Sequence, residues 1–247
     1  MTKRDRLIMI EKLYNAYING KLGGEIMPED ENPGFSKDSL ENYTYFTLPM
    51  ALNYQRNSYK LWESANLTYN DPETRFVFDT KKVLSSSFED VQKALVKYRV
   101  ALQKDKQTQI WITLCNTIEN LLSGDIRNIF KICDNDVNKI RNFIQIEHKK
   151  EFPYLSGNKL CNYWMYVIYQ YTDMDYLNKQ DLTIAPDTHV LKSSVKLDII
   201  TESEYESSNA QLICIENWNK LLKGTKFSPI DIHTPLWLWS RSGFIDI

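Results

Sequence analysis

The sequence predicts an all-helical protein, and three observations support this prediction. Apolar residues recur every three or four positions along most of the 247-residue chain, which is the spacing of an amphipathic helix. Hydrophobic residues make up 43% of the composition, including 15 Tyr, 10 Phe and 6 Trp, so there is ample material for a core. Only 8 Gly and 8 Pro are present, which argues against a turn-rich β protein.

Each helix expected in the first part of the chain combines helical spacing with a start or stop signal. The pair Gly23-Gly24 ends the first helix, Asp38 can cap the second, and Ser87 begins the fourth with a capping-box pattern. The segment 69–80 carries a turn signal and is expected to be irregular. The predicted helices cover 2–22, 38–53, 56–67, 87–102, 105–122, 125–132 and 136–147.

Four further helices are expected in the C-terminal part of the chain. A hairpin-like segment, FPYLSGNK, precedes the first of them, and a polar connector over 173–183 separates the first from the second. The predicted helices cover 158–171, 187–197, 205–223 and 229–241. No strand and no internal repeat is expected.

Charge and composition exclude several classes of function. The formal net charge is −2, so the molecule is not a polycation that grips nucleic acid indiscriminately, and any such contact must be local. One basic stretch, 139–160, carries five basic side chains against two acidic ones. The N-terminus does not resemble a signal peptide, and nowhere do eighteen apolar residues run together. We therefore expect a cytoplasmic protein, nucleoid-associated in a prokaryote, with no membrane partner.

The cysteines and histidines do not form a metal-binding pattern. The four cysteines are widely spread and include no C-x-x-C pair. The histidines, too, are scattered, so neither a metal site nor an iron–sulfur cluster nor another cofactor is expected. The residues concerned are Cys115, Cys133, Cys161, Cys214, His148, His189 and His233.

Two segments carry the functional argument: FPYLSGNKLCNYW at 152–164 and IAPDTHVLKSSVKL at 184–197. In the first, a short hairpin with a glycine leads into a helix that bears a lysine in its first turn. In the second, a proline-led Asp-Thr-His begins another helix. This order of motifs resembles the helix-hairpin-helix (HhH-GPD) DNA glycosylase superfamily. The resemblance implies that Lys159 matches the catalytic lysine and Asp187 the partnering aspartate.

The chemistry of these positions agrees with the resemblance. A lysine near a helix N-terminus, flanked by Tyr154, Leu155 and Trp164, is expected to be desolvated, and burial and the helix dipole both disfavour the ammonium form. A free amine is what a Schiff-base nucleophile requires. Asp187 would deprotonate or orient the lysine and stabilise the cationic sugar. Two structural alternatives remain open: a surface lysine in a first turn, and an aspartate that serves only as an N-cap.

A third similarity lies at 43–65, where Leu52-Asn53-Tyr54-Gln55 follows an apolar helix. By resemblance to the superfamily, Gln55 would fill the gap left by a flipped base, and the alternative is an exposed polar helix boundary. Trp237 and Trp239 are two residues apart and point to different sides of a helix, so one is expected in the core and the other in a cleft. The residues assigned to DNA or base binding are Gln55, Tyr154, Ser156, Gly157, Asn158, Trp164, His189, Trp237 and Trp239.

The sequence also departs from the pattern of the superfamily. Tyr154-Leu155-Ser156 stands where a Pro-Gly-Val is usual, which puts the first glycine's close approach to phosphate in doubt. The connector at 173–183 lengthens the interval between the lysine and the aspartate. In that respect the chain is nearer to the divergent archaeal 8-oxoguanine DNA glycosylase/AP lyases.

The resemblance implies a bifunctional DNA N-glycosylase/AP lyase of base-excision repair. We expect a monomer that acts on double-stranded DNA with a damaged or modified base, flipped out of the helix. The predicted lobes are 66–170, which ends in the hairpin, and 1–65 together with 171–247, with the active cleft between them. Two alternatives remain: an N-glycosidase that acts on a modified nucleoside or nucleotide, and a non-enzymatic helical module that binds nucleic acid.

Overall fold

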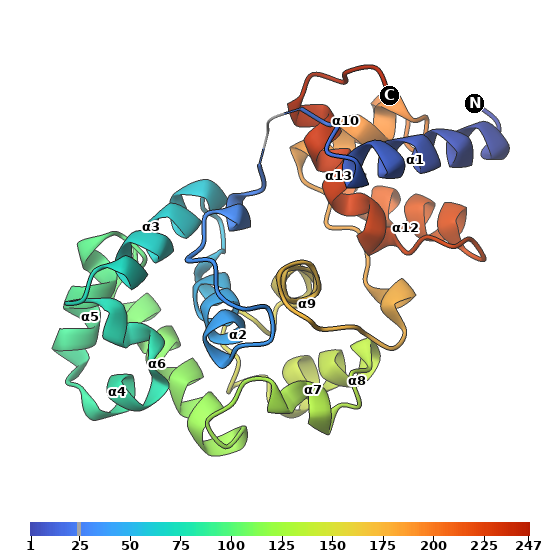
Figure 1. The fold of residues 1–247 in the computed structure, drawn as a ribbon. Helices are drawn as coiled ribbons and strands as arrows, with labels where there is room; N and C mark the ends of the chain where they lie inside the picture. The colour runs from blue at the N-terminus through green and yellow to red at the C-terminus, as the bar shows by residue number, and fades with distance from the viewer. Residues whose placement is uncertain (24–25) are drawn as a thin grey trace. The chain divides into compact units, whose positions relative to one another are not determined.

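The computed structural model describes residues 1–23 and 26–247, and it is helical along the chain (Figure 1). Thirteen α-helices lie in these two ranges, with short 3-10 and π turns between some of them. The extended pairing within the same ranges is a single isolated bridge between Asp136 and Leu177. The prediction of an all-helical protein is therefore confirmed.

The chain divides into two compact units. Unit 1 consists of Met1–Met27 and Lys179–Ile247, and unit 2 consists of Pro28–Asn178. The sequence-based division had instead placed 28–65 and 171–178 with the terminal segments. Residues 28–65 belong to unit 2 because α2 (Leu40–Thr47) packs against α9 (Asn158–Tyr171), and α3 (Ser58–Asn70) packs against α5 (Phe88–Lys97).

Unit 2 is built around large aromatic side chains. Trp62, Trp111 and Trp164 are fully buried, and the Trp111 indole donates a hydrogen bond to the carbonyl of Val77 at 2.8 Å. Its α-helices are α2 (Leu40–Thr47), α3 (Ser58–Asn70), α4 (Thr80–Ser85), α5 (Phe88–Lys97), α6 (Lys104–Leu121), α7 (Asn128–Ile132), α8 (Val137–Asn142) and α9 (Asn158–Tyr171). The shorter turns are η1 (Pro28–Asp30), η2 (Pro49–Leu52), η3 (Arg75–Phe78) and the π-helical η4 (Phe143–Glu147).

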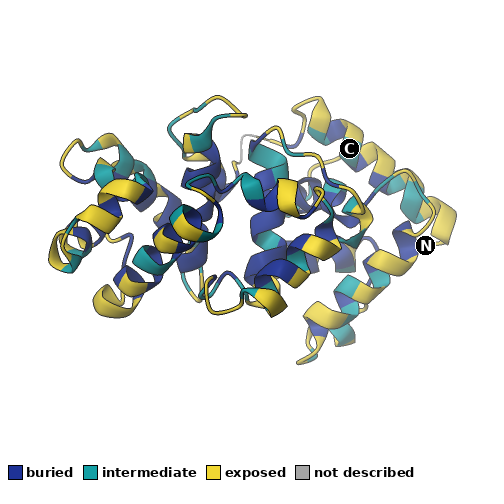
Figure 2. Ribbon diagram, turned by 90° about the horizontal axis from the view of Figure 1, so that it is seen from below, coloured by how far each residue is buried: buried dark blue, intermediate teal, exposed yellow. Residues whose placement is uncertain are grey.

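Unit 1 is centred on the packing of two helices, α10 and α13. Ser193 in α10 donates to the carbonyl of Leu236 in α13 at 2.7 Å, and Trp218, fully buried, donates to Ser194 at 2.8 Å. Figure 2 shows the helices with buried inner faces and exposed outer faces. The elements of unit 1 are α1 (Lys3–Ile18), η5 (Lys179–Asp181), α10 (Thr188–Lys196), α11 (Glu202–Tyr205), α12 (Ala210–Leu222) and α13 (Pro229–Arg241).

Several predicted boundaries were wrong for local reasons. The helix predicted over 38–53 is α2 followed by the 3-10 turn η2, because Pro49 has no N–H to continue the α-helical ladder. The segment predicted as irregular contains η3 and leads into α4, whose cap is Asp79. The helix predicted over 205–223 is interrupted by a turn between α11 and α12.

Other departures concern helix ends. The helix predicted over 136–147 changes from α to π geometry at Phe143, and α5 ends at Lys97 instead of near 102. The first helix ends at Ile18, and Gly24 of the predicted Gly23-Gly24 stop lies outside the described residues. No helix in the described ranges combines the length and the apolar composition needed to cross a bilayer.

Candidate functional site

The hairpin before α9 is a tight turn with an unusual tyrosine. Tyr154 has a positive φ of 63°, a conformation that costs a residue with a Cβ about 1 to 2 kcal/mol. Gly157 follows in an extended conformation at the N-cap of α9. A Cβ built at Gly157 would lie 3.2 Å from the carbonyl oxygen of Tyr154, so this close turn favours a glycine at position 157.

The backbone amides of the hairpin divide into two groups. Those of Leu155, Ser156 and Gly157 donate to carbonyls inside the hairpin, at 2.8 to 2.9 Å. Those of the next three residues, 158–160, form the first turn of α9, and the N-cap Gly157 has no side chain to accept from them. Ser156 and Gly157, assigned to DNA binding from the sequence, therefore have no backbone amide free for a phosphate, and the amides without an acceptor are those of residues 158–160.

Lys159 is the second residue of α9 and is exposed to solvent. The expectation that Tyr154, Leu155 and Trp164 bury its amine is therefore wrong. Trp164 instead belongs to the core: its ring stacks on Phe130 with centroids 5.6 Å apart, and its indole donates to Thr47 at 3.0 Å. With no exposed surface, Trp164 cannot stack on a base.

The structure brings the loop that contains Gln55 next to the hairpin. The rings of Tyr54 and Tyr154 lie 5.4 Å apart, and the Lys106 ammonium lies over the Tyr154 ring at 5.1 Å. Gln55 is exposed and has a positive φ of 50°, so it forms the tip of its loop. The sequence indicated Gln55 and the hairpin as two separate candidate segments, and only the tertiary structure shows that they lie close together.

The loop that carries Gln55 is anchored by its neighbour. The Arg56 guanidinium donates to the carbonyls of Val100 and Arg99 at 2.7 and 3.2 Å. Burial lowers the pKa of Arg56 to about 10, with a smaller contribution from the charge of Arg99. The amide of Gln145 donates to the Asn158 side chain at 3.2 Å, which links η4 to the start of α9.

In unit 1, the Asp187 carboxylate accepts three hydrogen bonds. Asp187 is the N-cap of α10, and its Oδ1 accepts from the backbone amides of His189 and Val190 at 2.9 and 3.0 Å. Its Oδ2 accepts from the indole N–H of Trp237 at 2.9 Å. These three donors fix the orientation of a half-buried negative charge.

The helix α13 supplies the surroundings of this carboxylate. Trp237 and His233 lie one turn apart on α13, and both are buried. Burial lowers the pKa of His233 to about 4, while the charge of Asp187 acts in the opposite direction. His233 is therefore neutral near pH 7. Sequence reasoning missed His233, and the signal that pointed to it was its i, i+4 spacing from Trp237.

The remaining predicted residues of unit 1 have different environments. His189 lies near Trp237, with ring centroids 5.2 Å apart, and its Nδ1 is 3.2 Å from the Ser240 hydroxyl. Trp239 packs edge-on against Phe244 and donates to the carbonyl of Ile245 at 2.9 Å. Trp237 and Trp239 are only 5% and 4% exposed, so both are core residues, and the prediction that one of them lines a cleft and stacks on a base is wrong. Of the two, Trp237 is the one that contacts Asp187.

Sequence reasoning also missed a buried acid in unit 2. Glu29 is fully buried, and its Oε1 accepts from the Trp62 indole at 2.9 Å and from the Tyr163 hydroxyl at 3.0 Å. Its Oε2 is buried without a hydrogen-bond partner among the described residues. Burial raises the pKa of Glu29 to about 7, against the opposing effect of these hydrogen bonds. Tyr163 stands one helical turn beyond Lys159 on α9.

Lys159 belongs to unit 2 and Asp187 to unit 1. Unit 1 therefore contains a helix-capping carboxylate near a neutral histidine, and unit 2 contains an exposed amine, a pair of tyrosines and a buried acid. Within residues 1–23 and 26–247, no group of three or more His, Cys, Asp or Glu side chains is arranged to hold a metal ion. Searches against protein-family models and against curated proteins found no match to this chain.

Proposed function

We propose that this protein is a DNA N-glycosylase with AP lyase activity, a divergent member of the helix-hairpin-helix superfamily that acts on a damaged or modified base in double-stranded DNA. The observation that carries the proposal is the Asp187 carboxylate. The resemblance requires an aspartate that caps a helix and keeps a defined charge, and Asp187 accepts from two backbone amides of α10 and from the Trp237 indole.

In the proposed reaction, the amine of Lys159 attacks C1′ of the extruded nucleotide after losing its proton. The new C–N bond forms as the glycosidic bond breaks, and the base leaves with the bonding electrons and takes up a proton. The bond between C1′ and the ring oxygen O4′ then breaks, O4′ takes up a proton, and a protonated imine forms between Lys159 and C1′. This iminium acidifies the C2′ position, and loss of a C2′ proton breaks the C3′–O bond and expels the 3′ phosphate. The exposure of Lys159 in the first turn of α9 leaves the amine accessible to such a substrate.

Asp187 would stabilise the positive charge that develops on the sugar as the glycosidic bond stretches. A carboxylate with three fixed donors needs little reorganisation during the reaction, because its orientation is already set by the helix and the indole. The neutral His233 beside it adds no positive charge that would compete for Asp187. Orientation and charge therefore both suit this role.

The surface around the hairpin suits DNA. Aromatic rings stack on bases whatever their sequence, and Tyr54 and Tyr154 form such a pair next to the exposed tip residue Gln55. Lys106, which lies over Tyr154, would contact a phosphate. The open amides at the start of α9 would bind a second phosphate, since a helix N-terminus favours anions.

Borohydride trapping tests the proposed nucleophile. The purified protein, incubated with duplex DNA that carries an abasic site or 8-oxoguanine, should form a covalent adduct on a denaturing gel when borohydride is present. We expect Lys159→Gln to reduce the trapping rate by at least about a hundredfold. The matched control is Lys93→Gln, which removes an exposed lysine from α5 of the same unit and should trap at the normal rate.

The same experiment can overturn the proposal. An adduct that persists in Lys159→Gln would assign the nucleophile elsewhere. No adduct with the native protein at low salt, together with intact DNA, would reject a Schiff-base mechanism. Release of a free base from a modified nucleoside would then favour the second candidate, a nucleoside-directed N-glycosidase that uses a carboxyl to assist water. The near-neutral net charge of −2 favours this candidate, because a small substrate does not need an extended cationic surface.

A further inference from the structure

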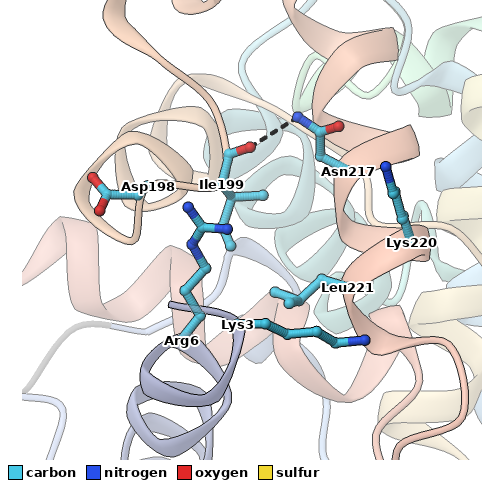
Figure 3. Close-up of a pocket in the computed structure, with 7 residues that line it drawn as sticks. All are labelled: Lys3, Arg6, Asp198, Ile199, Asn217, Lys220 and Leu221. Atoms are coloured by element: carbon cyan, nitrogen blue, oxygen red, sulfur yellow. Dashed lines mark hydrogen bonds between the residues drawn. The ribbon is translucent and has the colours of Figure 1, made fainter. Parts of the chain in front are cut away.

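A separate cavity in unit 1 lies among the start of α1, the turn after α10 and the last turns of α12 (Figure 3). Its volume is about 330 Å³, which is in the range of pockets that hold a small ligand. The residues that line it are Lys3, Arg6, Asp198, Ile199, Asn217, Lys220 and Leu221. None of these residues belongs to the site of the proposed glycosylase activity.

Three basic side chains border the cavity, and none of them forms an ion pair with the described residues. Lys3, Arg6 and Lys220 form no ion pair or side-chain hydrogen bond with the described residues, and the Nε of Arg6 is buried without an acceptor. A buried donor that lacks an acceptor costs about 1 to 3 kcal/mol. Three cations that face one cavity repel one another as well, so an anion in the cavity would relieve both costs.

The single acid in the lining does not neutralise these cations. Asp198 accepts a hydrogen bond from the N-terminal ammonium at 2.8 Å, and this contact is the main reason why the pKa of its carboxyl is lowered. The charge of Asp198 is therefore matched mainly by that of the Met1 ammonium, and the charge of Arg6 interacts with it to a smaller extent. The cavity keeps an excess of positive charge, which selects for an anionic ligand.

The walls of the cavity suit a ligand larger than a simple ion. Ile199 and Leu221 form apolar walls that are nearly closed to solvent, being 7% and 8% exposed. Asn217 donates from Nδ2 to the carbonyl of Ile199 at 2.8 Å (dashed line in Figure 3). This hydrogen bond fixes the side chain and leaves its amide oxygen available to accept from a ligand hydroxyl or amino group.

We infer that this cavity binds a phosphate group carried by a ligand of mononucleotide size. Arg6 is the central residue, because a guanidinium can contact two phosphate oxygens at once, and Lys3 and Lys220 add charge at the rim. The apolar walls would pack against the sugar and base, and Asn217 would accept from one of their donors. The phosphate can come from a free nucleotide or from the end of a nucleic acid strand.

Calorimetric titration with 2′-deoxyadenosine 5′-monophosphate tests the inference on the full-length protein. We expect binding by the native protein and no detectable binding of 2′-deoxyadenosine, which lacks the phosphate. Arg6→Gln should weaken nucleotide binding at least about tenfold, the loss typical of a charge-assisted pair. Arg4→Gln is the matched control, because Arg4 lies on the same helix outside this lining. Lys220→Gln, at an exposed position, should weaken binding about threefold.

A second titration identifies the source of the phosphate. It compares a short single strand that bears a 5′ phosphate with the same strand without it, each competed by the mononucleotide. Tighter binding of the phosphorylated strand, lost in Arg6→Gln, would assign a strand end, whereas binding of the mononucleotide alone would assign a free nucleotide. Absence of binding by both ligands, or equal binding by Arg6→Gln and the native protein, would overturn the inference. Neither outcome depends on Lys159, so the proposed function is tested separately.

Discussion

At the scale of single residues, Glu29 is the side chain whose environment departs most from that of an ordinary acid. Its carboxyl is fully enclosed, one oxygen has two donors, and the other has none. Desolvation therefore exceeds the stabilisation that hydrogen bonds from its own backbone, Tyr163 and Trp62 provide, and the pKa rises from 4.5 to about 7. Near neutral pH, the protein contains both protonated and ionised Glu29.

This shift should appear in the pH dependence of stability. Because the folded state binds the proton more tightly than the unfolded chain does, Glu29 favours folding below about pH 4.5 and loses this contribution as the pH rises to about 7. Glu29→Gln has no titrating group at this position and should not lose stability in this way. We therefore expect the free energy of unfolding of Glu29→Gln, minus that of the native protein, to increase by roughly 3 kcal/mol between pH 4.5 and pH 8. Denaturant unfolding at several pH values measures the difference.

The control for this measurement is Glu31→Gln. Glu31 lies two residues away and is exposed, so its substitution should change stability by no more than about 0.5 kcal/mol at either pH. A Glu29→Gln profile that runs parallel to that of the native protein would show that burial does not control the ionisation of this carboxyl. The pH dependence contributed by His233 is common to all three proteins and cancels in the comparison.

At the scale of elements, one side chain at the start of α10, that of Asp187, has both a structural role and a proposed catalytic role. Asp187 caps the helix through two backbone amides and also holds the Trp237 indole of α13. An N-cap contributes about 1 kcal/mol, and an indole N–H left without an acceptor costs a similar amount or more. A structural role and a catalytic role for Asp187 are therefore compatible, and substitutions must separate them.

Two substitutions at Asp187 separate its contribution as a helix cap from the contribution of its negative charge. Asparagine caps helices as well as aspartate does, so Asp187→Asn should lose only the contact with Trp237, about 1 to 2 kcal/mol. Asp187→Ala should lose the cap as well, about 2 to 3 kcal/mol in total. Both variants lack the negative charge, so we expect both to trap abasic DNA at least about a hundredfold more slowly than the native protein.

The control is Asp79→Asn, at the cap of α4, which should leave trapping unchanged. If Asp187→Asn trapped DNA at the native rate, the carboxylate would serve only as a helix cap. Denaturant unfolding and the trapping assay together measure the two contributions.

At the scale of the whole molecule, the net charge of −2 means that DNA binding must depend on a small set of cations. The hairpin region provides such a set: Lys106 lies over the Tyr154 ring, and Lys149 and Lys150 precede the hairpin in the chain. Few phosphate contacts give a modest dependence on salt, since each contact contributes about 0.9 to the slope of log K against log salt concentration.

The salt dependence of binding checks this local surface. We expect the affinity for an abasic duplex, measured by fluorescence anisotropy, to decrease with salt, and Lys106→Gln to lower the magnitude of the slope by about one. Lys12→Gln, which removes an exposed charge from α1, should leave the slope unchanged. Equal slopes for the native protein and both variants would mean that the surface around Tyr154 does not contact DNA.

Local signals predicted much of the secondary structure. The starts of α5 and α10 were correct, because Ser87 and Asp187 accept hydrogen bonds from amides two or three residues ahead, and such contacts depend on neighbouring residues alone. The hairpin and the start of α9 were recognisable for the same reason. The ends of helices were less predictable: α2 gives way to a 3-10 turn at Pro49, and α8 to a π turn at Phe143.

The sequence by itself determined the helical class and two short segments in which Lys159 and Asp187 start or cap helices, because spacing and capping act within a few residues. Tertiary structure alone decided which side chains meet: Tyr54 with Tyr154, Trp237 with Asp187, and the buried Glu29 with Trp62 and Tyr163. It also assigned Trp164 and Trp239 to the core. Burial and contacts between distant segments depend on how helices pack, and an amphipathic pattern shows which face is apolar without showing what will cover it.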